Sequence, residues 1–210
     1  MFSVIKLGGC NGSGKTTVAR ALLAEINGVP RCSRKTKKNP DYYIGRWGLT
    51  EVLVLGPYVT TCGGMDSISD KLQRMALIQW ACKGDRIVFF EGLITGKTYG
   101  AIGAISELHL SAKRGKWIYA FMDTPFETCV ERVGLRRAAA GKGMEDFDPE
   151  RTMRPTFDSC TSLLRKIQGV QKAKIGEQPF PHPTHLVKHD KSPKAEAIRL
   201  LKAAEKLRNA

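Results

Sequence analysis

The sequence predicts an α/β domain in which a parallel sheet lies between layers of helices. Two observations support this prediction. Short apolar runs typical of buried strands alternate with segments of helical periodicity along most of the 210 residues. The first apolar run, residues 4–7, is followed by a glycine-rich segment and then by a helical segment over 16–26. We expect one domain, 1–210, because its length and its 42% hydrophobic content suffice for a single core.

The glycine-rich segment is a phosphate-binding P-loop. Residues 9–16 read GCNGSGKT and match the pattern G-x-x-x-x-G-K-[ST]. The glycines let backbone N–H groups approach an oxyanion, and the N-terminus of the following helix favours negative charge. The motif assigns Lys15 to the β- and γ-phosphates and the Thr16 hydroxyl to Mg²⁺, so ATP and Mg²⁺ are the expected ligands. The expected nucleotide-binding residues are Gly9, Asn11, Gly12, Ser13, Gly14, Lys15, Thr16 and Thr17.

Residues 28–50 interrupt the alternation of strands and helices, and we interpret them as a basic, aromatic insertion that forms a loop or hairpin. Basic side chains can follow phosphates while aromatic rings stack on bases, so this segment is a candidate nucleic-acid-binding site. The alternative is a solvated loop over a small-molecule pocket. The candidate residues are Arg31, Arg34, Lys35, Lys37, Lys38, Tyr42, Tyr43 and Trp47.

Two carboxylates are candidates for the chemistry. After a strand over 52–55, Asp66 precedes a helical period over about 68–83, where it either caps that helix or acts as a catalytic base. Glu91 directly follows the apolar run 87–90, a strand expected to be buried on both faces. Its place at a strand's carboxyl end suits Mg²⁺ binding or proton transfer, and the alternative is a cap on the next turn.

The second half of the chain continues the pattern. Moderate helical character over 98–114 is followed by a strand over 117–122, by Thr124 as an expected cap and by Pro125 in a first helical turn. Arg132 and Arg136 share a helical face, where they either clamp a phosphate or lie in solvent. We expect 134–155 to be a mobile lid. The last expected elements are a helix over 156–174, a strand over 184–187 and a helix that begins at Ser192-Pro193.

Charge and composition narrow the possible partners. Lysine and arginine number 34 against 20 acidic residues, a net charge of +14, which favours a polyanionic partner such as DNA over a merely solvated surface. The six cysteines form no C-x-x-C pair and are expected to be reduced thiols. No apolar stretch reaches the length of a membrane span and no leader pattern opens the chain, so we expect no membrane association and a cytoplasmic location.

These residues carry a resemblance. The P-loop, Glu91-Gly92 and Asp123-Thr124-Pro125 with the arginines that follow resemble the P-loop kinase family over about residues 1–140. The resemblance implies a three-layer fold, an ATP-dependent transfer to a hydroxyl group, and a basic lid formed by Arg132 and the region of Arg136. Nucleoside, nucleotide and polynucleotide kinases are similar, as are phage enzymes that phosphorylate 5-hydroxymethyluracil in DNA. Many nucleotide kinases carry an acidic-Arg pair where this chain has Glu91-Gly92, which leaves the acceptor open.

Three hypotheses therefore follow: a kinase whose acceptor hydroxyl belongs to DNA, a kinase for small molecules, and an ATPase stimulated by nucleic acid. The first accounts for the net charge and for the basic, aromatic insertion together. In all three, the candidate metal ligands are Thr16 and Glu91. The candidate catalytic residues are Lys15, Asp66, Glu91, Arg132 and Arg136.

Overall fold

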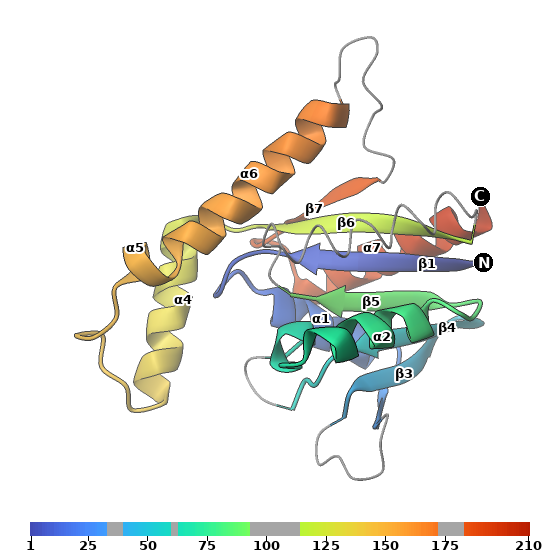
Figure 1. The fold of residues 1–210 in the computed structure, drawn as a ribbon, viewed down its shortest axis with the longest axis horizontal. Helices are drawn as coiled ribbons and strands as arrows, with labels where there is room; N and C mark the ends of the chain where they lie inside the picture. The colour runs from blue at the N-terminus through green and yellow to red at the C-terminus, as the bar shows by residue number, and fades with distance from the viewer. Residues whose placement is uncertain (33–39, 60–62, 93–113, 172–182) are drawn as a thin grey trace.

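The computed structural model describes residues 1–32, 40–59, 63–92, 114–171 and 183–210. Within these residues, the chain forms a seven-stranded sheet in the order β2-β3-β4-β5-β1-β6-β7, with helices on both faces (Figure 1). The strands are β1 Phe2–Gly8, β2 Val29–Arg31, β3 Tyr42–Trp47, β4 Thr50–Leu55, β5 Ile87–Glu91, β6 Gly115–Asp123 and β7 Thr184–Lys188. The helices are α1 Lys15–Glu25, α2 Lys71–Ala81, α4 Phe126–Ala139, α5 Pro149–Thr152, α6 Arg154–Gln171 and α7 Pro193–Asn209, with a 3₁₀ turn, η1, over Met65–Ser67.

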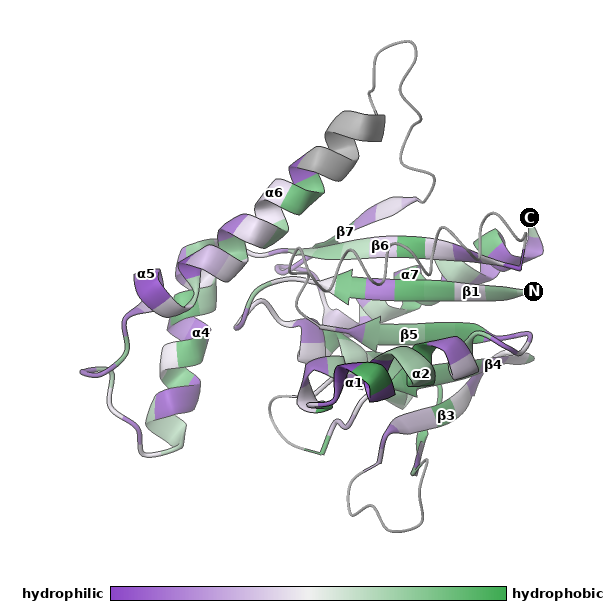
Figure 2. Cartoon of the chain, viewed as in Figure 1, coloured by the Kyte–Doolittle hydropathy of each residue, from purple (hydrophilic) through white to green (hydrophobic). Residues whose placement is uncertain are grey.

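Strand alternation divides the core between the two faces of the sheet. Ile5 and Leu7 of β1 face the side covered by α1 and α7. Phe2 and Val4 face the opposite side, where α2 packs together with leucines of α6. β1 and β5 are mostly hydrophobic along their length, as expected for strands covered on both faces (Figure 2). The expected three-layer arrangement is confirmed.

The sheet is mixed rather than wholly parallel. β4, β5, β1, β6 and β7 pair in parallel, whereas β2 pairs with β3 and β3 with β4 in antiparallel register. The insertion over 28–50 therefore adds two strands to one edge of the sheet, and its hairpin belongs to the sheet itself. Because the five parallel strands point the same way, their carboxyl ends meet at one edge, where β1 leads into the P-loop (Figure 1).

Two helices differ from the prediction at their ends. α2 begins at Lys71 rather than near residue 68, because the Asp70 carboxylate accepts hydrogen bonds from the backbone N–H groups of Leu72 and Gln73 and caps the helix there. α4 continues to Ala139, so the segment expected to be a mobile lid from residue 134 is helical at its start and again in α5. The helix predicted over 98–114 lies almost wholly outside the described residues.

Two other expectations can be compared with the described residues. The thiols of Cys10, Cys32, Cys82, Cys129 and Cys160 are all unbridged, as predicted for reduced cysteines, while Cys62 lies outside the described part. Among the helices that the structure describes, none combines the length and the apolar character needed to cross a bilayer.

Candidate active site

The P-loop wraps around the ammonium group of Lys15. Lys15 is 8% exposed, and its Nζ donates hydrogen bonds to the carbonyl oxygens of Gly9 and Cys10, each at 2.9 Å. Gly12 has a φ of 80° and packs so closely on α4 that a Cβ there would lie 2.2 Å from the Cys129 carbonyl oxygen. The loop thus needs glycine at this position both for its left-handed backbone and for space.

Thr124 fastens the P-loop to the end of β6. Its hydroxyl donates a 2.8 Å hydrogen bond to the Ser13 carbonyl oxygen, and the Thr124 side chain is buried. The prediction that Thr124 caps α4 is wrong, because Pro125 occupies the N-cap position and no side chain caps that helix. The Ser13 hydroxyl is itself buried and has no hydrogen-bond partner among the described residues.

Glu91 and Thr16 lie together at the carboxyl edge. The Thr16 hydroxyl donates a 2.8 Å hydrogen bond to Oε1 of Glu91, which is 2% exposed. Burial raises the pKa of Glu91, while Lys15 and the Thr16 hydroxyl oppose that rise. Mg²⁺ prefers oxygen ligands and binds through one or two protein groups together with substrate phosphates, so this pair beside the P-loop fits that ion.

Asp66 lies beside Glu91. A Cβ on Gly92 would lie 2.9 Å from Oδ1 of Asp66, and one on Gly64 would lie 2.7 Å from the Glu91 carboxylate. The charge of Asp66 accordingly contributes to the raised pKa of Glu91. Asp70, not Asp66, caps α2, so the capping role weighed for Asp66 on that helix is excluded.

A cavity of about 730 Å³ joins these groups. Arg132 and Arg136 reach it from α4, and Nη1 of Arg132 would lie 3.5 Å from a Cβ on Gly14, so its guanidinium group lies above the P-loop. Arg137 instead donates to the Gly143 carbonyl oxygen and lies over the Phe147 ring. The expected residues that line the cavity are Asn11, Gly12, Ser13, Gly14, Lys15, Thr16, Thr17, Asp66, Glu91, Arg132 and Arg136.

Basic residues at the end of β7 belong to the site, although they were not predicted from the sequence. Lys188, His189 and Lys191 line the same cavity. Lys188 forms an ion pair with Asp123 at the end of β6, and Nδ1 of His189 lies 2.6 Å from the Asp123 carbonyl oxygen. The sequence did contain a signal for these residues: like Glu91, they lie at the carboxyl end of a predicted strand, where parallel sheets form their ligand sites.

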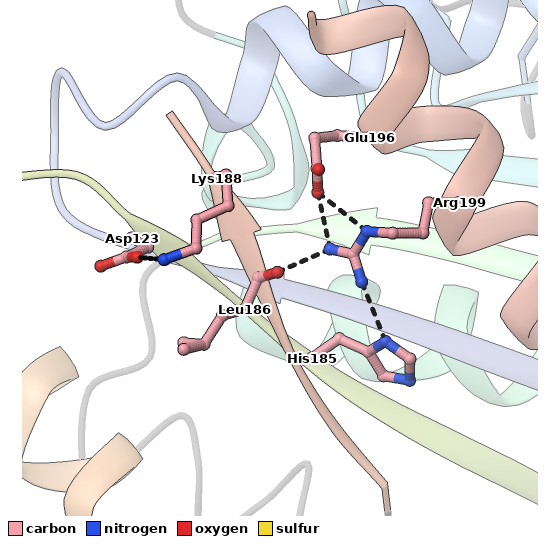
Figure 3. A network of polar contacts seen from close by, with 6 residues as sticks. All are labelled: Asp123, His185, Leu186, Lys188, Glu196 and Arg199. Carbon is pink, nitrogen blue, oxygen red and sulfur yellow. Dashed lines mark hydrogen bonds and ion pairs between the residues drawn. The ribbon is translucent and has the colours of Figure 1, made fainter. Parts of the chain in front are cut away.

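Arg199 of α7 contacts residues of β7, next to the turn that joins these two elements. Its guanidinium group contacts Glu196 at 2.6 Å, donates to the Leu186 carbonyl oxygen at 2.6 Å and lies 3.2 Å from Nδ1 of His185 (Figure 3). Burial and the Arg199 charge together lower the pKa of His185, which favours its neutral form. These contacts fix the start of α7 and, with it, the β7–α7 turn that lines the cavity.

Of the predicted nucleic-acid-binding residues, Arg31 and the three aromatic residues lie in the described part of the chain. Arg31 is exposed at the end of β2, and its partner Tyr42 pairs with Leu55, so Arg31 lies at the carboxyl edge. Tyr43 is buried and packs against the Tyr58 ring, so it cannot stack on a base. The other predicted residues of the basic run, Arg34, Lys35, Lys37 and Lys38, lie outside the described residues.

The remaining two aromatic residues also serve the core. Tyr42 packs against Trp80 of α2, with ring centroids 4.9 Å apart. Trp47 pairs with Thr50 at the opposite end of β3 from the carboxyl edge, and it packs on the core beneath α1 and α7. The position of Trp47 does not fit the base-stacking role predicted for it, whereas for Tyr42, half-buried beside Arg31 at the carboxyl edge, that role stays a prediction.

Comparisons with known proteins show which family the chain belongs to. The family model for 5-hmdU DNA kinase matches residues 2–154, which include the P-loop, both carboxylates and α4. The 5-hmdU DNA kinase of Pseudomonas phage PaMx11 is 29% identical over 76% of this chain and 84% of its own length. The 5-hmdU DNA kinase of Pseudomonas phage M6 is 29% identical over 74% of this chain and 84% of its own.

A solved structure, deoxyadenosine kinase from M. mycoides with bound dCTP, aligns over 97% of this chain and 99% of its own, at 11% identity and a TM-score of 0.44. The family match covers more than half of the sequence, and it includes the P-loop, Asp66, Glu91, Arg132 and Arg136. The chain belongs to the 5-hmdU DNA kinase family.

Proposed function

We propose that this protein transfers the γ-phosphate of ATP to the hydroxymethyl group of 5-hydroxymethyluracil in DNA. The observation that carries the proposal is the meeting of a P-loop with two neighbouring carboxylates, Asp66 and Glu91, in one cavity. Membership of the 5-hmdU DNA kinase family supplies the acceptor. The P-loop supplies the donor, because its glycines, Lys15 and helix N-terminus form a polyphosphate site.

The transfer forms one bond and breaks one. The acceptor oxygen attacks the γ-phosphorus while the bond from that phosphorus to the β–γ bridging oxygen breaks, and ADP leaves with the electron pair. We assign the acceptor proton to Asp66, since η1 presents this carboxylate to the cavity next to Glu91. Lys15 and Arg132 lie where negative charge develops on the phosphates.

Thr16 and Glu91 are the groups that would hold Mg²⁺, through their hydroxyl and carboxylate oxygens. When bound, the ion neutralises charge on the phosphate oxygens and orients them. Burial of Glu91 beside Thr16 keeps its carboxylate in one place, which reduces the rearrangement needed to receive the ion.

We assign Arg132 and Arg136 to a lid that covers the phosphates. Both arise from α4 on the same helical face and both line the cavity. α4 projects beyond the carboxyl edge of the sheet (Figure 1), and its arginines line the cavity beside the P-loop, which supports this assignment. Repulsion between two arginines at this spacing is relieved when a phosphate binds between them.

DNA would approach along the carboxyl edge. Arg31, the last residue of β2, lies at this edge and is exposed. A net charge of +14 suits a polyanionic acceptor. Because the acceptor hydroxyl is attached to a stacked base, the nucleotide must be flipped out to reach the γ-phosphate in the cavity.

Asp66→Asn tests the assignment of the base. The change keeps the size of the side chain but removes its capacity to take a proton, so we expect single-turnover phosphorylation of 5-hydroxymethyluracil DNA to slow by roughly 10² to 10⁴-fold. Asp70→Asn is the matched control, since asparagine caps a helix as well as aspartate does. Equal rates for both variants and the wild type would exclude Asp66 as the base.

A further inference from the structure

Lys6 lies in the middle of β1, the central strand of the parallel part of the sheet. It is the only charged residue in β1, and it is 2% exposed. Its backbone pairs with Phe90 of β5 on one side and with Tyr119 of β6 on the other. Lysine is almost never fully buried unless its charge is paired, so this position calls for a specific partner.

The Lys6 ammonium group lies beside Gly92, at the carboxyl end of β5. Its Nζ donates a 3.0 Å hydrogen bond to the Gly92 carbonyl oxygen and lies 5.3 Å from the centre of the Phe90 ring. Gly92 directly follows Glu91, and a Cβ on it would lie 2.9 Å from Oδ1 of Asp66. Lys6 therefore binds a residue that follows one of the two proposed functional carboxylates and lies close to the other.

The charges around Lys6 favour its cationic form and burial opposes it. Asp66 and Glu91 attract the ammonium group, in that order of strength, and Lys15 repels it more weakly than either attracts it. Cys160 of α6 adds a still weaker attraction. Burial outweighs these attractions and lowers the pKa of Lys6 to about 8, so at neutral pH a buried cation lies next to two acidic groups.

We propose that Lys6 is a positioning residue for phosphoryl transfer, which holds Asp66 and Glu91 side by side at the ends of their elements. Two neighbouring carboxylates repel each other, and a cation that both attract offsets that repulsion. Through the Gly92 carbonyl oxygen, Lys6 also fixes the backbone next to Glu91. Lys6 touches neither nucleotide nor acceptor, because it does not line the cavity. This inference rests on the proposed function of Asp66 and Glu91.

The test is a double-mutant cycle between Lys6 and Asp66. Lys6→Met replaces the ammonium group with an apolar side chain of similar length, and it leaves Asp66 and Glu91 without the cation that attracts them. We expect Lys6→Met to lower kcat for 5-hydroxymethyluracil DNA by about 10 to 100-fold, since small misplacements of catalytic groups cost up to about 10²-fold. KM for ATP should stay unchanged, because the P-loop is untouched.

In the Asp66→Asn background, Lys6→Met should lower kcat by a smaller factor than in the wild type, because only Glu91 of the two carboxylates that Lys6 positions still carries its charge. Lys116→Met is the matched control: Lys116 also lies in a central strand, but it pairs with Ser3 at the opposite end from the carboxyl edge. It should leave kcat unchanged. Lys6→Gln keeps an amide donor without the charge and should behave as Lys6→Met does, which provides a second variant if methionine prevents folding.

Each outcome decides the inference. Wild-type kcat in both Lys6 variants would overturn it, as would an equal fractional loss in the wild-type and Asp66→Asn backgrounds, since a general structural defect is additive. A rise in KM for ATP with unchanged kcat would also overturn it. If the wild type itself transfers no phosphate to this DNA while it phosphorylates another acceptor, the proposed acceptor fails, and the cycle is run with the acceptor that is used.

Discussion

Replacing Lys6 should change how the stability of the protein depends on pH, in a direction that the structure defines. Burial lowers the pKa of Lys6 from its ordinary 10.5 to about 8. Below pH 8 the ammonium group is charged in both the folded and unfolded states, so the folded protein bears the full cost of burying it. Between pH 8 and 10.5 the folded state has lost a proton that the unfolded state still binds, so the free energy of unfolding rises with pH in this window.

The size of this rise follows from the pKa. Each pKa unit is worth about 1.4 kcal/mol, so a fall from 10.5 to about 8 corresponds to about 3 kcal/mol. The wild type should gain this amount relative to Lys6→Met between about pH 7 and about pH 10.5, because methionine binds no proton. Taking the difference between the two proteins removes the contribution of every other group whose pKa does not depend on Lys6.

Urea unfolding of both proteins at about pH 7 and about pH 10.5, followed by far-UV circular dichroism, measures the difference. Lys116→Met, compared with the wild type in the same way, is the control for a half-buried lysine on the same sheet. If the free-energy difference between wild type and Lys6→Met is the same at both pH values, the Lys6 ammonium group is not a buried cation, and the reasoning about its partners fails.

Three further changes test the P-loop and its supports. Gly12→Ala should lower ATP affinity at least about 10-fold in a binding titration, because its φ of 80° and the Cys129 carbonyl oxygen 2.2 Å from a new Cβ forbid the present loop. Gly141→Ala is the control, since Gly141 has a φ of 68° but open space around it. It should lower the free energy of unfolding by only about 1 kcal/mol and leave ATP affinity unchanged. Thr124→Val should destabilise the protein by about 1 to 3 kcal/mol in urea, since the buried Ser13 carbonyl oxygen loses its donor. Lys15→Ala should abolish transfer while the circular dichroism spectrum stays that of the wild type, and full activity would contradict the P-loop assignment.

The sequence was sufficient to predict the carboxyl edge of the sheet. Strand length, helix period and the small size of glycine are local rules. They predicted the P-loop at residues 9–16, the strand before it and the strand that ends at Glu91, and the structure confirms these elements. Because parallel strands end at the same edge, the presence of Glu91 at the P-loop edge could be predicted, whereas the adjacency of β1 and β5 that brings it to Thr16 could not.

Features that depend on tertiary packing could not be predicted. Tyr43 follows a basic run and resembles an exposed stacking residue, yet its strand places it against Tyr58 in the core. Thr124 precedes a helix as a cap would, but Pro125 takes the N-cap position and the Thr124 hydroxyl donates to the Ser13 carbonyl oxygen of the P-loop. Lys6 lies within an apolar run that gives no sign of its role, since its buried partners come from Gly92 and Asp66, far along the chain.

The identity of the acceptor is the central claim, and one labelling experiment tests it most directly. The wild type is incubated with γ-labelled ATP and either duplex DNA containing 5-hydroxymethyluracil, the same duplex containing thymine, or the free 5-hydroxymethyl nucleoside, and the products are digested to nucleosides. We predict label on the 5-hydroxymethyl oxygen of the modified duplex and none on the thymine duplex, which lacks that hydroxyl. Faster labelling of the free nucleoside than of the modified duplex, or ATP hydrolysis without labelled DNA, would contradict the account.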